Sequence, residues 1–256
     1  MFEYTLTEAN RLVLSNAFRN VPRVDIGIDS VIEGHMGKAI VDDPNNPGAF
    51  KLQVGPFCYF AGDFSSDPAT EIIKQQEAYS LIMVCPEDAI EIARNHFAER
   101  LIRFPRYSFS SERLSLEYIA SLIDDSSFRS RITKIDGTVL DRVASRPDHF
   151  LDISVFESAT DFLIRGTGYA VIHNDAIAGV AYSSLICNSA IEVSIYVEPE
   201  YREQGMATAL GCALIKECLK RSIDPHWDAA NIESCRLAEK LGYVSAGTYD
   251  AYFVNR

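Results

Sequence analysis

The sequence predicts an α/β fold, an α+β mixed sheet, arranged as two successive domains. A strand pattern runs into an amphipathic helix pattern over residues 190–221, and helix and strand patterns alternate over residues 67–110. An Asp-Asp-Ser-Ser break at residues 124–127 separates these regions. The chain has 256 residues, 47% of them hydrophobic, which is enough for two ordinary domains. We therefore expect a smaller α/β domain over residues 1–123 and a second domain over residues 124–256.

The elements of the first domain follow from apolar periodicity, caps and turn residues. Thr7 stands where a helix cap is expected, and His35 lies in a glycine-flanked segment without an acidic or metal-binding companion nearby. We interpret this histidine as a loop or strand residue rather than as a ligand or base. The expected elements are a helix at 6–17, strands at 34–41 and 55–61, a helix at 67–76, a strand at 79–85, a helix at 86–100, a strand at 106–110 and an apolar-periodic segment at 114–123.

The second domain shows a longer series of elements. A hairpin turn is expected at Asn174-Asp175, and the last strand pair is expected to break near Gly247. The series is a strand at 129–135, helices at 137–145 and 158–165, strands at 168–173, 176–186 and 190–197, a helix from 206, a strand near 226–229, a helix at 232–241 and the final strand pair.

The junction between the strand at 190–197 and the helix that follows it can hold an anion. The first turn of a helix has backbone N–H groups without intrahelical partners and carries partial positive charge. Gly205 and Ala207 leave room for a diphosphate to approach the backbone, and Arg202 adds a cation. An ordinary strand-to-helix turn that binds nothing would show the same pattern.

Two motifs in this half resemble the GNAT superfamily of acyltransferases. Val197-x-Pro199-x-x-Arg202-x-x-Gly205-x-Ala207 is similar to the acetyl-CoA motif R/Q-x-x-G-x-G/A, and residues 231–243, NIESCRLAEKLGY, resemble its second segment. The connecting residues 225–231, PHWDAAN, resemble a GNAT subgroup with an additional N-terminal domain. The resemblance covers about half of the chain and implies a C-terminal GNAT fold with a splayed central sheet.

The resemblance also implies a site for acetyl-CoA as cosubstrate. Tyr196 and Val197 would offer backbone groups to the pantetheine arm, and Arg202 would support a phosphate. The other residues implied are Gln204, Gly205, Met206, Ala207 and Thr208 at the diphosphate, and Asn231 and Ser234 near the pantetheine. Two of these residues have an ordinary alternative: Thr208 can bond back to its own helix turn, and Asn231 can cap the helix that follows. Trp227 is interpreted as a core residue.

Acetyl transfer requires an amine without its extra proton, and Glu192 is the predicted general base. A surface carboxylate without a catalytic role is the alternative. Family members commonly carry a tyrosine acid where this chain has Ala238. Cys235, Tyr243 and Tyr196 are substitutes by proximity only, so the general acid is not assigned.

Composition excludes several classes of function. A formal net charge of −12 argues against nucleic acid as a partner, and the acidic surface is either simply solvated or attracts a cationic amine. No apolar run is long enough for a membrane span, and the first residues lack a signal-peptide pattern, so we expect a cytoplasmic protein. The six cysteines contain no C-x-x-C pair. We interpret them as reduced thiols and expect neither disulfides nor a metal.

The sequence thus predicts an acetyl-CoA-dependent N-acetyltransferase that acts by direct attack of a small-molecule or peptide amine. The acceptor is not identified, and a homodimer is an open expectation. The main alternative is a non-catalytic acyl-CoA-binding or sensing module that has retained the phosphate turn. A third alternative is an interaction protein in which the GNAT fold is structural. Binding of acetyl-CoA, followed by thiol release with amines, would distinguish the three.

Overall fold

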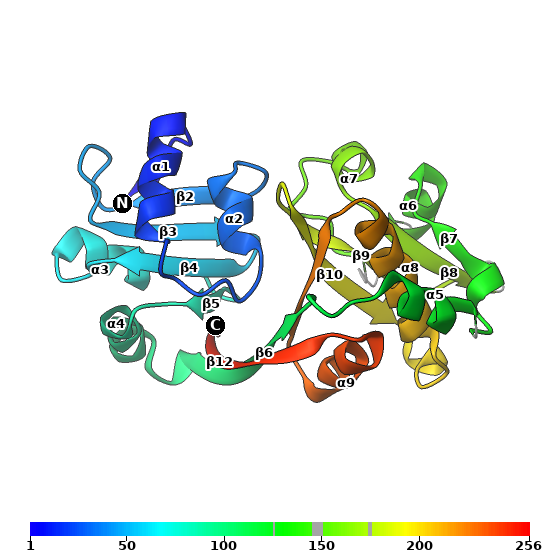
Figure 1. The fold of residues 1–256 in the computed structure, drawn as a ribbon. Coiled ribbons are helices and arrows are strands. Elements are labelled where there is room, and N and C mark those ends of the chain that lie inside the picture. The colour runs from blue at the N-terminus through cyan, green and yellow to red at the C-terminus, as the bar shows by residue number, and fades with distance from the viewer. Residues whose placement is uncertain (125, 145–150, 174–175) are drawn as a thin grey trace. The chain divides into compact units, whose positions relative to one another are not determined.

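The computed structural model describes residues 1–124, 126–144, 151–173 and 176–256, which form two compact units (Figure 1). Unit 1 comprises Met1–Arg106 together with Thr248–Arg256, and unit 2 comprises Tyr107–Gly247. The chain passes between the units twice, in β6 (Leu101–Ser110) and in β12 (Val244–Val254). Both units combine helices with a sheet, as the sequence predicted.

Unit 1 is built on a sheet with the strand order β1-β2-β3-β4-β5-β12. The described pairings are antiparallel except for β4 with β5, which are parallel. Phe60, Phe64 and Ile82 lie in its core with residues from α3 and α4. The elements are β1 (Phe2–Tyr4), α1 (Glu8–Ala17), α2 (Gly27–Ile32), β2 (Lys38–Val41), β3 (Ala49–Val54), β4 (Phe57–Gly62), α3 (Asp67–Lys74), β5 (Leu81–Val84) and α4 (Glu87–Phe97).

Local signals in unit 1 explain both the predictions that hold and those that fail. The Thr7 side chain caps α1 as expected, by accepting from the N–H of Asn10. The sequence reading missed α2 and missed β3, which pairs with β2 and β4. The α2 helix has six residues and no side-chain cap, so it carries no clear helix signal.

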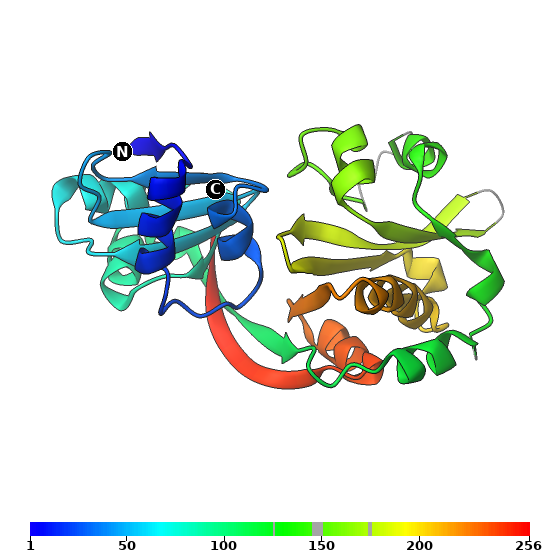
Figure 2. The same ribbon diagram turned by 45° about the horizontal axis from the view of Figure 1, so that its top comes forward.

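Unit 2 is built on the strand order β6-β11-β10-β9-β8-β7. Figures 1 and 2 show α6 and α7 on one side of this sheet and α5, α8 and α9 on the other. The expected order of elements in this half is confirmed as far as α9, and the turn at Asn174-Asp175 lies outside the described residues. The elements are α5 (Leu116–Asp124), β7 (Ile132–Lys134), α6 (Gly137–Ala144), α7 (Ala159–Arg165), β8 (Gly168–His173), β9 (Ala176–Ile186), β10 (Ala190–Val197), α8 (Met206–Lys220), β11 (Asp224–Ala229) and α9 (Ile232–Leu241).

The helix α8 forms the centre of the core of unit 2. Leu210, Leu214 and Ile215 are fully buried, and α8 contacts β8, β9, β10 and β11 as well as α5 and α9. Gly211 lets α8 approach its neighbours, because a Cβ there would lie 3.0 Å from Leu241 and 3.1 Å from Ile195. This packing fixes the N-terminus of α8 beside the end of β10.

The units divide the chain differently from the expected domains 1–123 and 124–256. The helix α5, expected in the first domain, packs against α8, and the Tyr118 hydroxyl donates to the carbonyl of Lys240 at 3.0 Å. The last residues, expected in the second domain, return to unit 1, where Tyr252 and Phe253 pair with β5. The end of the chain is one long strand, not two, and it continues through Gly247 at φ +123°. Such long-range pairing has no local sequence signal.

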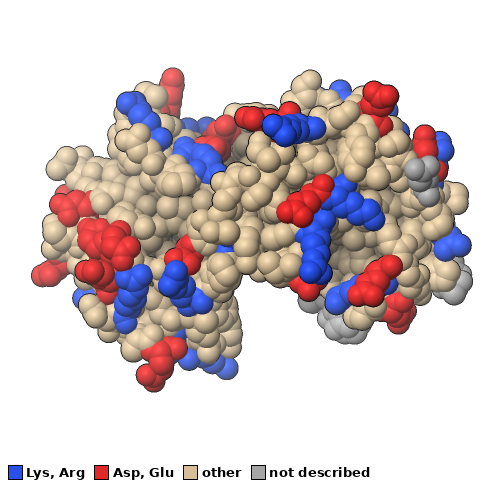
Figure 3. Space-filling view, turned by 60° about the horizontal axis from the view of Figure 1, so that its bottom comes forward, with Lys and Arg blue, Asp and Glu red and all other residues tan. Residues whose placement is uncertain are grey.

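The surface charge and the character of the helices bear on the possible partners of the protein. On the face drawn in Figure 3, Lys and Arg are interspersed with Asp and Glu, whereas a nucleic-acid-binding surface normally gathers its cations into a patch. No helix among the described residues has the length and apolar character to span a bilayer.

All six cysteines carry free thiols, and burial raises the pKa of Cys58 to about 11 and those of Cys212 and Cys218 to about 12.

Candidate functional site

The parallel strands β10 and β11 separate after three paired positions. Ala190, Ile191 and Glu192 pair with Asp224, Pro225 and His226. Beyond this point β10 pairs with β9 as far as Val197, while β11 pairs with β6 from Trp227 to Ala229. The β10 edge that turns away from β9 is therefore available to a ligand that adds to the sheet as an extended strand. We call this opening the β10–β11 split.

The N-terminus of α8 lies directly after the end of β10. Gly205 is its N-cap residue, with φ +85° and ψ 2°, and no side chain caps the helix. A Cβ on Gly205 would meet nothing within 4 Å, so the space above the turn is open. The amides of the first helical turn thus face a space that an anion can enter.

The side chains of Arg202 and Gln204 brace this turn. Arg202 Nε donates to the carbonyl of Val197 at 3.0 Å, and its guanidinium lies 5.9 Å from the ring centre of Tyr196. Gln204 Nε2 donates to the carbonyl of Glu200 at 3.0 Å. These contacts give Arg202 a structural role that the motif did not indicate. The Arg202 side chain is also exposed, and its binding to a phosphate stays a prediction.

The remaining residues of the turn differ in what they can present to a ligand. Met206 is 1% exposed, and its Sδ would lie 3.1 Å from a Cβ on Gly179 of β9. Its side chain is therefore part of the core, and only its backbone can contribute to the site. Ala207 and Thr208 are half-buried at the same helix end.

Asn231 and Ser234 form the N-terminal turn of α9. Asn231 Oδ1 accepts from the Ser234 N–H at 2.8 Å, which confirms that Asn231 caps the helix. The Ser234 hydroxyl accepts from the indole N–H of Trp227 at 3.2 Å. Trp227 is 4% exposed and packs against Tyr243, which confirms it as a core residue. The described contacts of Asn231 and Ser234 are thus structural, and their contact with pantetheine stays a prediction.

Glu192 is buried, with 8% of its surface exposed. This excludes the alternative that it is a surface carboxylate. Its Oε2 lies 2.9 Å from His226 Nδ1, and its Oε1 accepts from the backbone N–H of Asp228 at 3.0 Å. The carboxylate therefore connects β10 to β11 at the position where the strands separate. Sequence reasoning missed His226. The available signal was its alternation with the buried residues Pro225 and Trp227 along β11.

The three substitutes for a tyrosine acid differ in accessibility. Tyr243 is 4% exposed and donates to the carbonyl of Pro225 at 2.6 Å, and burial raises its pKa well above the usual value. Burial also raises the pKa of Cys235. Tyr196 is half-buried, with its hydroxyl 3.5 Å from Glu198 Oε2. Ala238 is fully buried on the core face of α9, so its small size serves packing.

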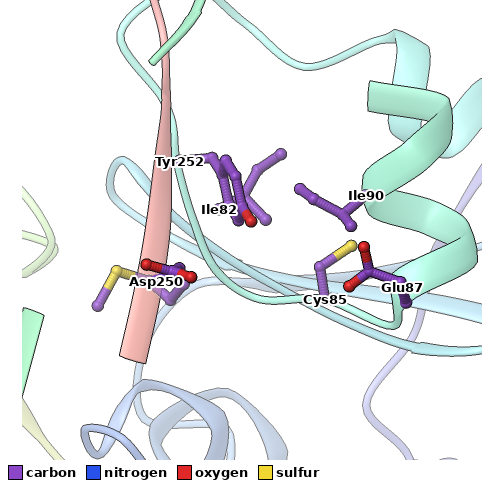
Figure 4. A pocket seen from close by; sticks show the side chains of 7 residues that line it. Ile82, Cys85, Glu87, Ile90, Asp250 and Tyr252 are labelled. Atoms are coloured by element: carbon purple, nitrogen blue, oxygen red, sulfur yellow. The ribbon is translucent and has the colours of Figure 1, made fainter. Parts of the chain in front are cut away.

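A separate cavity of about 180 Å³ lies in unit 1 (Figure 4). Its carboxylates are already paired, because Glu87 contacts Arg94 at 2.7 Å and Asp250 contacts Arg103 at 2.7 Å. Burial raises the pKa of the Cys85 thiol far above the usual value, so the thiol stays neutral. We assign no chemistry to this cavity. Its lining residues are Ile82, Met83, Cys85, Glu87, Ile90, Asp250 and Tyr252.

A metal centre has no support among the residues that the structure describes, where no three His, Cys, Asp or Glu side chains form a suitable group. The groups that the described residues present at the β10–β11 split are carboxylate, imidazole, hydroxyl and backbone groups.

Comparison with known proteins identifies the family. Over 100 residues the chain is 31% identical to the uncharacterized N-acetyltransferase YdfB of Bacillus subtilis, and this aligned region is 38% of each of the two chains. Over 92 residues it is 29% identical to the [ribosomal protein bS18]-alanine N-acetyltransferase of Escherichia coli, covering 35% of this chain and 62% of that one. The chain thus aligns with less than two thirds of the length of either relative.

A solved structure of a GCN5-related N-acetyltransferase-like protein from Streptococcus suis has the same fold, with a TM-score of 0.84 and 24% identity. The superposition covers 96% of this chain and 99% of that one. The sequence profile of the GNAT acetyltransferases matches residues 24–252 and so includes most of unit 1, which the two motifs left unassigned. Because this match spans most of the sequence, the chain belongs to the GNAT acetyltransferase family.

Proposed function

We propose that the protein is an acetyl-CoA-dependent N-acetyltransferase in which an amine attacks the thioester directly. The observation that carries this proposal is the opening between β10 and β11 beside the uncapped N-terminus of α8. An open strand edge and a row of helix N–H groups are the two features that an extended ligand with a diphosphate requires. Family membership supports the same activity.

The residues around the split fit acetyl-CoA, which would supply the acetyl group as a thioester. The backbone of Tyr196 and Val197 would bind the pantetheine arm, although the Val197 carbonyl already accepts from Arg202. The amides from Gln204 to Thr208 would bind the diphosphate, and Gly205 leaves the space open. Asn231 and Ser234, at the start of α9, complete the predicted set.

Glu192, the predicted general base, belongs to the acid–base group of this proposal together with the residues bonded to it. Its carboxylate lies at the closed end of the split, where the strands separate, and its two oxygens bond to β11. A reaction at this position would place the amine proton within reach of Glu192 or of a group bonded to it. Protonation of the departing thiolate is left to solvent or to Tyr196.

The acceptor is an amine of a small molecule or peptide. The E. coli relative is named for an alanine of the ribosomal protein bS18. That name makes peptide amines a reasonable part of an acceptor panel. The net charge of −12 favours acceptors with additional positive charge.

The wider assignment concerns the whole chain. We assign it to a two-domain GNAT subgroup, with unit 1 as the additional N-terminal domain and unit 2 as the acetyl-CoA-binding domain. We further propose a cytoplasmic location and leave a homodimer as an open expectation. The profile match from residue 24 supports treating both units as parts of one family architecture.

A non-catalytic acyl-CoA-binding module is the second candidate. The observation that favours it is Ala238, which is fully buried where the family commonly has a tyrosine acid. Both oxygens of Glu192 are also engaged in hydrogen bonds. Such a protein would keep the binding features of the split without turnover.

One experiment separates these functions. Calorimetry would first measure the binding of acetyl-CoA, and thiol release would then be followed over a panel of polyamines, aminoglycosides and peptides. Binding with release supports the acetyltransferase, and binding without release supports the non-catalytic module. Absence of binding by the folded protein would contradict both.

A further inference from the structure

We propose that His226 accepts the proton of the acceptor amine and that Glu192 is the positioning residue that holds the imidazole in the required tautomer. The inference rests on the proposed acetyltransferase function and assigns the base within that site. Its starting point is the 2.9 Å contact between Glu192 Oε2 and His226 Nδ1. This pair stands at the last paired position of β10 and β11.

The strand geometry places both side chains on one face of the sheet. Residues in register on neighbouring strands point to the same face, and the direction alternates along each strand. Pro225, Trp227 and Ala229 are buried along β11, whereas His226 and Asp228 between them are half-buried. The His226 side chain is 17% exposed, against 11% for Glu192. The imidazole is thus the more accessible member of the pair.

The hydrogen bond fixes which nitrogen of His226 can accept a proton. An ionised carboxylate only accepts hydrogen bonds, so Nδ1 must carry the proton that is donated to Glu192. In the neutral imidazole, Nε2 then has the lone pair that accepts a proton. The nearby carboxylate also favours the imidazolium that this transfer forms.

Glu192 itself is less suited to accept the proton. Its carboxylate receives hydrogen bonds from His226 and from the backbone N–H of Asp228. Both carboxylate oxygens are therefore already engaged with β11. An imidazole has an unperturbed pKa near 6.5, which suits proton transfer at neutral pH.

The reaction is balanced with these groups. The ammonium form of the acceptor gives one proton to His226 Nε2, and the neutral amine then forms a bond to the acetyl carbon. The bond from carbon to sulfur breaks, and the thiolate leaves with the electron pair and takes a proton from solvent. The amine loses its second proton to solvent, and His226 returns to the neutral form in the same way.

A purely structural explanation would also produce the contact, since the pair ties β10 to β11. The two roles differ in their pH dependence. The titratable groups near His226 include Glu192 on β10, and Asp224 and Asp228 at alternate positions on its own strand. A catalytic histidine would give kcat/KM an acidic limb at the imidazole pKa, and removal of the imidazole would shift this limb to the pKa of the acceptor amine.

The test uses the full-length protein and the panel amine that gives the fastest thiol release. His226→Asn keeps a donor for Glu192 near the position of Nδ1 but removes Nε2, and His96→Asn, at an exposed position of α4, is the matched control. We expect His226→Asn to lower kcat by about 10²-fold or more and to replace the acidic limb of kcat/KM at the imidazole pKa with one at the pKa of the acceptor amine. Calorimetric affinity for acetyl-CoA should stay within about twofold, and amines with a pKa below the assay pH should be affected least.

Long-range 1H–15N NMR on the wild-type protein tests the tautomer without any variant. A proton on Nδ1 of neutral His226 supports the proposal, and a proton on Nε2 overturns it. An active His226→Asn enzyme with the wild-type pH profile of kcat/KM also overturns it, while leaving the acetyltransferase function intact. Absence of thiol release by wild-type protein over the whole panel would overturn the proposed function and this inference together.

Discussion

Trp227 donates its indole N–H to the hydroxyl of Ser234 at 3.2 Å and so joins β11 to the first turn of α9. Asn231 caps the same turn. Trp227 of the connecting residues, together with Asn231 and Ser234 of the second motif, thus fixes the start of α9 beside the strand that carries His226. In this structure the motif residues first build the scaffold, and their contact with a ligand is a separate question for experiment.

The first prediction concerns Gly205. Its φ of +85° favours glycine, and a Cβ there would enter open space above the α8 turn. Gly205→Glu adds bulk and negative charge at the proposed diphosphate position. Affinity for acetyl-CoA should fall by tenfold or more, about 1.4 kcal/mol, as measured by calorimetry.

Gly247 provides the matched control for this variant. It has φ +123°, and a Cβ there also meets nothing within 4 Å, but it lies in β12. Gly247→Glu should cost comparable thermal stability through backbone strain, since a positive φ costs an ordinary residue about 1–2 kcal/mol. It should bind acetyl-CoA as the wild type does. Equal loss of affinity in both variants would refute the diphosphate site.

The second prediction concerns the boundaries of the binding unit. Residues 107–247, expressed alone, should fold and bind acetyl-CoA, because they form one compact unit with both motifs. A fragment of residues 124–256 lacks most of α5, whose Ile119 and Ile123 are buried. It should therefore melt at a lower temperature in circular dichroism than residues 107–247. A folded 107–247 fragment that fails to bind, while the full chain binds, would show that unit 1 supplies part of the site.

The sequence predicted the features of this protein that are encoded locally. The alternation in β10 and the periodicity of α8 were sufficient to find the turn at Gly205, and a side-chain cap was sufficient to find α1 and α9. The return of β12 to β5 could not be found, because it depends on pairing between distant segments. The partnership of Glu192 with His226 depends in the same way on the register of β10 with β11.

The third prediction concerns Glu217 of α8. Burial opposes its ionisation, but hydrogen bonds from Lys134, Tyr169 and Thr167 outweigh burial and lower its pKa. A carboxylate with a lowered folded-state pKa stabilises the protein above its unfolded pKa, about 4.3, and loses that contribution as the pH falls through the folded value. Glu217→Gln should therefore lower the melting temperature at pH 7, and the difference should shrink below about pH 4.

Glu91→Gln on the exposed side of α4 is the control for Glu217→Gln and should change the melting temperature little at either pH. Differential scanning calorimetry at pH 7 and pH 3.5 gives both comparisons. A pH-independent difference for Glu217→Gln would mean that its contribution does not come from ionisation.

The last prediction concerns Glu192 in turnover. Glu192→Gln keeps the shape of the side chain but removes the negative charge beside His226, 2.9 Å away. Without that charge the imidazolium is less favoured and the tautomer is less strongly fixed, so kcat should fall by about 10²-fold near neutral pH. Affinity for acetyl-CoA should be nearly unchanged, and higher pH should partly restore the rate, because more of the amine is then already neutral.

Glu217→Gln serves here as the second carboxylate control, since Glu217 is also hydrogen-bonded but lies on α8 beside Lys134. Wild-type turnover by Glu192→Gln with an unshifted pH profile would remove Glu192 from the mechanism as the positioning residue, and His226 acting alone, Asp228 and solvent would then be tested as the base.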